Sequence, residues 1–217
     1  MRILQVHDHY LPCGGAEVYF TDIINSLEER GLEIAVLYSA MKGNGYKSSG
    51  RKEYFIPPSP GLLRGLSLLK EVRKIVNEIN PDVIHIHGFH GYTSPLIIRE
   101  LLRRCPTIHT AHDVMAFCLN REKICKYEND ICTKAVGWGC LTSRCISLFK
   151  KGIVILTLKS IIIQNFEMKQ YRNLQKVIVA SEYMRDELVR NGVSIENIEV
   201  LYCYLNVEND WLNWREK

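Results

Sequence analysis

Short runs of apolar residues alternate along most of the chain with longer stretches in which apolar residues recur every three or four positions. The short runs predict strands, and the longer stretches predict amphipathic helices. The predicted strands cover residues 2–7, 32–38, 53–56, 82–87, 107–111, 176–180 and 198–201. The predicted helices cover residues 16–30, 62–79, 94–103, 147–171 and 182–191. Strand and helix therefore alternate along the chain.

The predicted strands are apolar almost throughout, with no alternation of polar and apolar residues. Such strands are typical of a parallel sheet that is covered on both faces by helices. The chain is therefore predicted to form one doubly wound α/β domain with a mostly parallel sheet, over residues 1–202. In sheets of this kind, ligands bind at the carboxyl ends of the strands.

The helix predicted at 62–79 carries an apolar stripe along one face. Its members, at helical spacing, are Leu62, Leu66, Leu69, Val72, Val76 and Ile79. This spacing makes the helix strongly amphipathic, and Pro81 follows just beyond its end.

Two glycines, Gly14 and Gly15, lie between the first predicted strand and the first predicted helix. Glycine permits a close approach of the backbone and unusual φ angles. The free N–H groups and the dipole of a helix N-terminus favour an anion such as a phosphate. Neither a GxGxxG motif nor a Walker lysine accompanies the pair, so a simple tight turn is the alternative.

Histidines gather at the ends of the fourth and fifth predicted strands. His85 and His87 share one face of the fourth strand, His90 follows it, and His112 precedes Asp113 after the fifth strand. A single histidine more often only packs, but all 7 histidines precede residue 113 and most lie at predicted strand ends, which favours a site. An imidazole there serves as a hydrogen-bond partner, a general base or a metal ligand. The spacing matches no known metal pattern, so no metal is expected.

The composition is that of a globular protein. The 217 residues are 47% hydrophobic and 24% charged, which excludes disordered, collagen-like and coiled-coil chains. A net charge of +4 is too small to indicate nucleic-acid binding. The amino terminus lacks the apolar segment of a secretory signal, and no stretch approaches about 18 consecutive apolar residues. A cytoplasmic protein is therefore expected.

Basic residues are concentrated between positions 141 and 176, where seven Lys or Arg accompany one acid, Glu167. The helix predicted at 147–171 carries several of these lysines around an apolar body. Such a helix fits peripheral contact with an anionic membrane at its cytoplasmic face, or contact with a lipid-linked substrate. A buried helix with solvated lysines is the alternative, because residues 152–158 are apolar on every side.

Five of the 8 cysteines fall in the segment 118–145. They are Cys118, Cys125, Cys132, Cys140 and Cys145. A structural zinc, disulfides, and free or buried thiols are three interpretations, of which the absence of any CxxC pair favours thiols. No bound cofactor is expected.

Five segments resemble, in order and placement, the amino-terminal domain of family 4 retaining glycosyltransferases, enzymes of the GT-B fold. The segments are RILQVHDHYLPCGGAE, PDVIHIHG, TIHTAHD, VIVASEYMRDELVRNGV and IEVLYCYLNVEND. The resemblance covers most of residues 1–209, and some family members carry a cysteine-bearing insert like 118–145. It implies a Rossmann-like domain that forms one half of a GT-B fold.

The resemblance also implies an activity: transfer of a sugar from a nucleotide-sugar donor to an acceptor, with retention at the anomeric carbon and usually without an obligatory metal. By position, Gly14 and Gly15 would lie against the donor diphosphate, and His112 would be the catalytic residue that reaches the transferred sugar. Departure of a nucleoside diphosphate leaves concentrated negative charge, which backbone N–H groups at a helix N-terminus stabilise.

The resemblance places further residues around the same site. Glu17, His87 and His90 would lie toward the acceptor, and Asp113 and Ser181 would support the site. The acceptor is expected to be a saccharide or a lipid-linked molecule of surface polysaccharide, lipopolysaccharide or glycolipid biosynthesis.

In this family most of the nucleotide binds to a carboxy-terminal domain, whereas residues 203–217 resemble only the start of the interdomain hinge. We therefore expect a partner domain, in cis or as a separate chain, and no efficient transfer by this chain alone. A non-catalytic binding or scaffold module of the same fold is one alternative. A metal- or redox-sensing domain that uses the cysteines is another.

Overall fold

The structure, a computed structural model, describes residues 1–10, 14–39, 50–59, 61–88, 93–125, 130–142 and 151–202. These residues contain a seven-stranded sheet in the order β3-β2-β1-β4-β5-β8-β9. The strands are β1 Arg2–His7, β2 Glu33–Tyr38, β3 Lys52–Phe55, β4 Val83–Ile86, β5 Thr107–Ala111, β8 Lys176–Val179 and β9 Ile198–Val200. Every neighbouring pair is parallel, as the apolar strands predicted.

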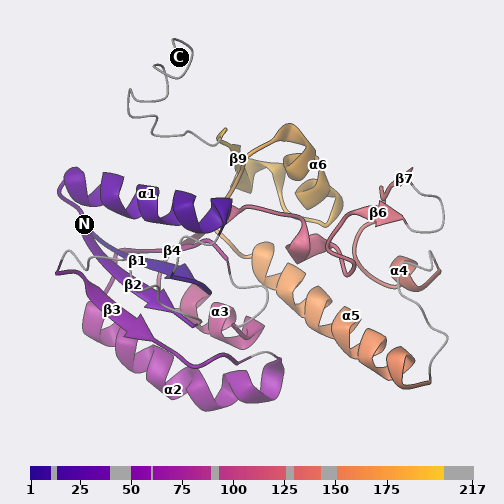
Figure 1. Ribbon diagram of the computed structural model, residues 1–217, viewed down its shortest axis with the longest axis horizontal. Helices are drawn as coiled ribbons and strands as arrows, with labels where there is room; N and C mark the ends of the chain where they lie inside the picture. The colour runs from indigo at the N-terminus through magenta and orange to yellow at the C-terminus, as the bar shows by residue number, and fades with distance from the viewer. Residues whose placement is uncertain are drawn as a thin grey trace, which may run out of the picture.

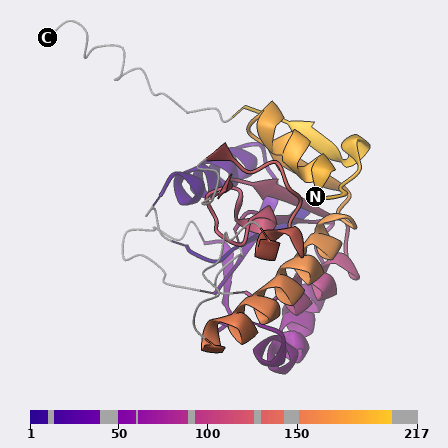
Figure 2. The same cartoon turned by 90° about the vertical axis from the view of Figure 1, so that its right-hand side faces the viewer.

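Five longer helices pack around this sheet. They are α1 Gly15–Glu29, α2 Leu62–Ile79, α3 Pro95–Leu102, α5 Lys151–Tyr171 and α6 Glu182–Arg190. Figure 1 shows α1 on one face of the sheet and α2 and α3 on the other. In Figure 2, α5 lies on the same side as α2. The predicted doubly wound α/β fold, with helices on both faces, is confirmed.

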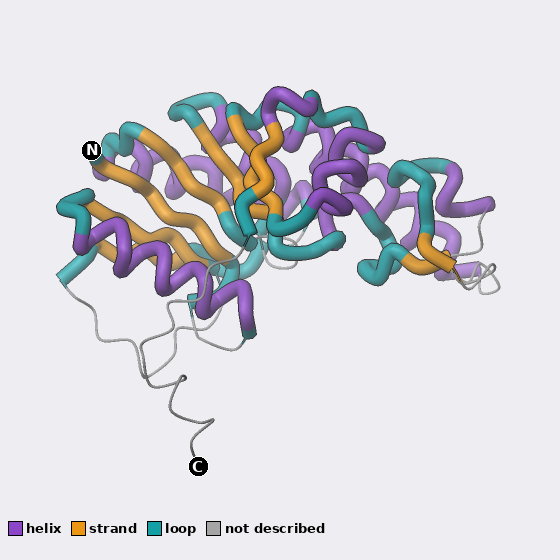
Figure 3. Tube along the Cα trace, turned by 90° about the horizontal axis from the view of Figure 1, so that it is seen from above, coloured by secondary structure: helices purple, strands orange, loops and turns teal. Residues whose placement is uncertain are grey.

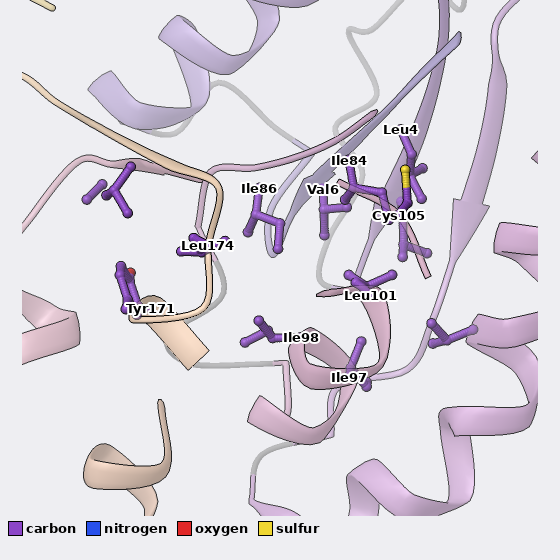
Figure 4. Close-up of a cluster of buried hydrophobic side chains, with 14 of the residues drawn as sticks. Leu4, Val6, Ile84, Ile86, Ile97, Ile98, Leu101, Cys105, Tyr171 and Leu174 are labelled. Atoms are coloured by element: carbon purple, nitrogen blue, oxygen red, sulfur yellow. The ribbon is translucent and has the colours of Figure 1, made fainter. Parts of the chain in front are cut away.

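Both faces of the inner strands are apolar, and this produces the layers. Ile3 of β1 packs with Phe20 and Ile24 of α1. Leu4 and Val6, on the opposite side of the same strand, belong to a larger cluster that includes residues of α2 and α3. Figure 4 shows part of that cluster, where side chains of β1 and β4 lie opposite α3. Figure 3 shows the twist of the strands between these layers.

Most element boundaries agree with the sequence prediction to within one or two residues, apart from the helix predicted from 147, whose first residues lie outside the described ranges. The segment between β5 and α5 was predicted only as an interruption. It contains the 3-10 helix η1 Met115–Phe117, the antiparallel pair β6 Ile124–Cys125 and β7 Asp130–Ile131, and α4 Gly139–Thr142. A further 3-10 helix, η2 Ile195–Asn197, precedes β9. Elements of two to four residues are too short to carry a periodic pattern.

The segment between β5 and α5 is held to α6 by a buried ion pair. Lys123 Nζ lies 2.7 Å from a carboxylate oxygen of Glu187, and both side chains are almost fully buried. The same Nζ donates to the Lys134 carbonyl at 2.6 Å. The Val136 N–H donates to the Asn191 side chain at 2.8 Å. The contacts to Glu187 and Asn191 therefore hold this segment against the domain, while the contact to the Lys134 carbonyl lies within the segment.

The cysteines within the described ranges form no disulfide: Cys105, Cys118, Cys125, Cys132 and Cys140. Across those same ranges, no group of three or more His, Cys, Asp or Glu side chains is arranged to hold a metal ion. Cys145 lies outside them.

Helix α5 carries part of the basic segment 141–176. At its carboxyl end Met168 and Tyr171 are buried. Lys150 and the Lys151 side chain lie outside what the structure describes, so their expected membrane contact stays a prediction. None of the helices in the described ranges is both long and apolar enough to cross a bilayer.

The apolar stripe of α2 is buried only in its second half. Val72 and Val76 are buried, whereas Leu66 is 56% exposed. The buried residue of the first two turns is Gly65, where an added Cβ would overlap the Ser94 hydroxyl at the start of α3. The close approach of these two helix starts leaves the neighbouring leucine outside the core.

The buried ion pair predicts a large difference between two lysine substitutions. Lys123→Met removes one of the two cationic partners of the buried Glu187 carboxylate and leaves Arg190 as the other, so the free energy of unfolding should fall by about 2 kcal/mol in urea denaturation. The matched control is Lys176→Met, which removes an exposed contact to Glu199 at 4.0 Å. That change should cost less than about 1 kcal/mol. Equal losses for the two variants would contradict the anchoring role of Lys123.

Candidate functional site

All strands of a parallel sheet end at one edge, and here the predicted site residues meet at that edge. Figure 1 shows α1 beginning where the arrowheads of the strands end. His87 directly follows β4, His112 directly follows β5, and Ser181 follows β8 as the residue before α6. Gly14 is the residue before α1.

Three side chains at this edge form a hydrogen-bonded chain. His112 Nε2 lies 3.3 Å from His87 Nδ1, and the other nitrogen of His87 lies 3.0 Å from Gln5 Oε1. Gln5 and His87 are fully buried or nearly so. Because the Gln5 oxygen can only accept, the proton of a neutral His87 is assigned to Nε2. His87 Nδ1 then accepts from His112 Nε2–H, which leaves His112 Nδ1 as an acceptor.

The environment keeps these imidazoles uncharged. Burial, followed by the nearby His112, lowers the pKa of His85 to about 3. Burial and then the surrounding histidines lower the pKa of His87 well below its ordinary value. The pKa of His112 is also lowered by burial, although Asp113 and Glu17 act in the opposite direction. At neutral pH the site therefore offers neutral imidazoles to a ligand.

Aromatic residues of α1 fix the orientation of the histidine rings. The Tyr19 ring meets His112 edge-on with 5.2 Å between centroids. Phe20 meets His87 edge-on at 5.0 Å. His87 and His112 are stacked at 5.6 Å. The sequence placed Tyr19 on the apolar face of its helix, and the contact with His112 could not be inferred from that periodicity.

The backbone of Gly14 does not have the unusual φ angle that the glycine pair allowed. Gly14 has φ −160° and ψ 177°, which is ordinary extended backbone, so no unusual φ requires glycine here. At Gly15 an added Cβ would meet nothing within 4 Å. Among the described residues, nothing therefore fills the space beside Gly15.

Glu17 lies beside the same helix start. Its carboxylate oxygen is 2.8 Å from where a Cβ on Gly14 would stand. Glu17 is the acidic residue of the first turn of α1, where a negative charge complements the helix dipole. Glu17, which was predicted to face the acceptor, thus also lies beside Gly14, where the diphosphate is predicted to bind.

A buried carboxylate that the sequence analysis did not single out joins three loops at this edge. Asp8, directly after β1, accepts from the Thr93 hydroxyl at 2.5 Å and from the Ser39 hydroxyl at 3.3 Å. The Asp8 N–H donates to the Gly88 carbonyl at 2.6 Å. The position of Asp8 directly after a predicted strand could have marked it as a site residue. The sequence analysis instead considered the histidines at the strand ends.

Two predicted supporting residues have local structural roles. Asp113 accepts from the Met115 N–H at 2.8 Å and so begins η1. Ser181 caps α6 by accepting from the Met184 N–H at 3.3 Å. His90 lies outside the described residues. His87 is buried and both of its ring nitrogens are engaged, so the geometry favours positioning of His112 over direct contact with an acceptor.

A hollow of about 470 Å³ lies at the opposite edge of the sheet, between the carboxyl ends of α2 and α3. Hydrogen bonds from Arg73, and then from Arg104, lower the pKa of Glu100 to about 2 against the effect of burial. Because these charges are paired with one another, this hollow is a weaker candidate than the histidine edge.

The buried neutral histidines predict a specific loss of stability in acid. In the unfolded chain they protonate near the ordinary value of 6.5, whereas His85 in the folded chain protonates only near pH 3. The unfolded state therefore binds more protons below pH 6.5, and the free energy of unfolding falls as the pH is lowered.

Between pH 6.5 and 4.5 the expected slope rises from about 0.7 to about 1.3 kcal/mol per pH unit for each such histidine. Urea denaturation at a series of pH values measures it. His85→Gln, which keeps a partner for Thr110, should reduce the slope. A flat profile in this window would contradict neutral burial of these rings.

Comparison with known proteins agrees with this architecture. The family model for Glycosyltransferase Family 4 matches residues 13–209. No curated protein sequence matches the chain. Among solved structures, the lipopolysaccharide outer core galactosyltransferase WaaB is similar, with a TM-score of 0.55 at 12% identity over 96% of this chain and 47% of that one. HepE of Anabaena, in complex with UDP and glucose, has a TM-score of 0.51 at 16% identity over 100% of this chain and 50% of that one.

A third structure with the same fold is the UDP-GlcNAc 2-epimerase of Neisseria meningitidis bound to UDP-GlcNAc. Its TM-score is 0.53 at 12% identity, over 92% of this chain and 45% of that one. The chain thus spans about half the length of these proteins. At such identities the structures show the fold alone, which is one half of a GT-B glycosyltransferase fold. Since the family match extends over most of the sequence, the chain belongs to Glycosyltransferase Family 4.

Proposed function

We propose that this chain is the acceptor-side half of a retaining glycosyltransferase. It would act on a nucleotide-sugar donor and on a saccharide or lipid-linked acceptor of surface polysaccharide, lipopolysaccharide or glycolipid synthesis. The observation that carries the proposal is the neutral His112 at the carboxyl edge, oriented by His87 and packed against Tyr19 in the first turns of α1.

Each part of this edge suits one part of the reaction. The acceptor hydroxyl oxygen bonds to the anomeric carbon and loses its proton, while the bond from that carbon to the diphosphate breaks and its electron pair leaves with the diphosphate, which takes up the proton. Backbone N–H groups at Gly14 and Gly15 and the α1 dipole would stabilise that negative charge. The neutral His112, with an acceptor at Nδ1 in the assigned tautomer, would take a hydrogen bond from a hydroxyl of the transferred sugar.

Glu17 is the proposed residue toward the acceptor. Its carboxylate accepts hydrogen bonds from hydroxyl groups, which saccharides supply. Its negative charge close to Gly14 also opposes an incoming diphosphate. The side chain therefore has to turn away from the helix start before the donor binds.

The proposal is tested by sugar transfer, measured with UDP- and GDP-sugars for this chain alone and for its mixture with a candidate carboxy-terminal half. Turnover is expected only in the mixture. His112→Ala should lower kcat by at least about 100-fold, because an oriented polar contact made in the transition state is lost. Lys176→Met serves as the surface control. A mixture that binds donor but whose turnover is insensitive to His112→Ala would favour the scaffold alternative.

Gln5→Leu tests the positioning of His112 separately. Without the Gln5 oxygen the tautomer of His87 is no longer fixed, so kcat should fall by about ten-fold while KM stays nearly constant. Lys176→Met is again the surface control and should preserve the His112 tautomer, which is read from the nitrogen shifts of the imidazole by NMR. Unchanged nitrogen shifts in Gln5→Leu would rule out the hydrogen-bonded chain as the orienting device.

A further inference from the structure

Three thiol groups lie around Lys123 in the segment between β5 and α5. The Lys123 N–H donates to Cys118 Sγ at 3.3 Å. The Cys132 N–H donates to the Lys123 carbonyl at 2.8 Å. Burial lowers the pKa of Lys123, whereas negative charge on three neighbouring thiols, of which Cys132 has the largest effect, raises it. The third thiol is Cys140, which interacts in turn with the other two. The three cysteines are therefore close to one lysine and to one another.

These three cysteines differ from the other described ones in their access to solvent. Cys118, Cys132 and Cys140 are partly exposed, whereas Cys105 and Cys125 are buried. A small oxidant in solution can therefore reach the thiols around the lysine while the domain stays folded. Oxidation of thiols follows their exposure and their thiolate character.

The backbone that joins Cys118 to Cys132 is bent in an unusual way. Arg121 and Lys123 have φ angles of 63° and 56°. Both lie in the left-handed region, which residues other than glycine adopt rarely. Such a conformation persists only where the surrounding structure holds it. A covalent bond between the two cysteines would close the loop that contains both bent residues.

The segment also has a small apolar core. Among the side chains that the structure describes in residues 114–142, the buried apolar ones are Phe117 and Cys125. Ile124 and Ile131, which pair across β6 and β7, are both exposed. A two-stranded ribbon is only marginally stable by itself, and disulfides commonly stabilise units whose core is small. A cross-link would therefore add stability where packing supplies little.

We propose that Cys118 and Cys132 are a site of oxidative modification, at which a peroxide joins them in a disulfide. Cys132 reacts first, because it interacts most strongly with Lys123 and an ammonium neighbour favours the reactive thiolate. Cys118 then closes the bond, since both cysteines are hydrogen-bonded to the backbone of the same lysine.

The reaction with hydrogen peroxide has two steps. The Cys132 thiolate attacks one oxygen of the peroxide and the O–O bond breaks, which leaves a sulfenic acid on Cys132 and releases hydroxide. This hydroxide takes up the proton that Cys132 lost and becomes water. The Cys118 sulfur then attacks the sulfur of the sulfenic acid, the S–O bond breaks, and the second hydroxide leaves as water with the Cys118 proton. Both thiols are oxidised, and the peroxide is reduced to two molecules of water.

A divalent metal ion fits these thiols less well than a disulfide. The Lys123 ammonium, which is paired with Glu187 at 2.7 Å, would repel a cation placed among the sulfurs. Burial raises the pKa of the Cys140 thiol. A metal binds the thiolate form, so this third thiol is a poor ligand. Both observations favour the cross-link.

The cross-link would lie close to the candidate site along the chain. Cys118 directly follows η1, whose first N–H is bonded to the Asp113 side chain next to His112. The disulfide would therefore tie the loop that leaves His112 to the ribbon β6–β7. The inference goes beyond the proposed function and does not depend on it, because no donor or acceptor takes part.

The experiment treats the reduced, folded chain with hydrogen peroxide, blocks the remaining thiols with iodoacetamide and maps tryptic peptides by mass spectrometry without reduction. A peptide that contains Cys118 is expected to be joined to one that contains Cys132. Thiol titration in denaturant should show the loss of two of the 8 thiols. The matched control is Cys105→Ser, which removes a buried thiol bonded to the Pro81 carbonyl and should leave the cross-link unchanged.

Dimedone, which labels sulfenic acids, tests the order of the two steps. In Cys118→Ser the sulfenic acid at Cys132 has lost its partner, so its labelling should rise by at least about ten-fold over the parent chain. In Cys132→Ser the labelling of Cys118 should stay weak, because Cys118 interacts less strongly with Lys123. Circular dichroism checks that each variant is folded.

Four results would overturn parts of the proposal. A cross-link that contains Cys140 or Cys145 would overturn the assigned pair. Equal dimedone labelling of Cys118 and Cys132 in the two variants would overturn their order. Thiols that resist peroxide in the folded chain would overturn the site itself. Zinc that stays bound through dialysis of the parent chain and is lost in Cys132→Ser would assign the thiols to a metal instead.

Discussion

The common direction of the strands is the constraint on which the rest of this molecule depends. In a parallel sheet every strand delivers the residue that follows it to one edge, and every returning helix begins there. Residues 7, 87 and 112 of the sequence are thus brought together with the start of α1. The same rule brings the start of α2, with its exposed leucines, to the edge where chemistry is proposed.

The buried histidines lower the stability of the fold relative to apolar residues at the same positions. Each ring must stay neutral and find partners in a layer where apolar residues would pack as well. Here the partners are other polar side chains, Gln5 for His87 and Thr110 for His85. The buried neutral rings make the fold less stable in acid. They also hold the imidazole of His112 neutral and in a fixed orientation. A fixed neutral group is suited to orienting a sugar hydroxyl next to a departing diphosphate.

Periodicity predicted the sheet, the helices and the edge at which His87 and His112 meet, because these follow from long apolar patterns and from strand direction. It could not predict contacts between residues far apart in sequence. Gln5 is a single polar residue within an apolar strand, and Asp8 lies between two histidines in the sequence. No local pattern therefore indicated the contacts of either residue. The helical spacing of α2 wrongly predicted that Leu66 is buried. The close contact between Gly65 and Ser94, and not the spacing, decides which side of this helix start is buried. The ion pair between Lys123 and Glu187 likewise joins two segments that no local pattern connects.

We propose that the donor sugar and its diphosphate lie at the carboxyl edge of this half. The most direct measurement is backbone and imidazole NMR of the isotope-labelled chain, in the presence of its carboxy-terminal half, during titration with UDP- and GDP-sugars. We expect one of these donors to shift the signals of Gly15 and His112 while those of Arg73 and Glu100 at the opposite edge stay unchanged. Donor-dependent shifts confined to the opposite edge would contradict it.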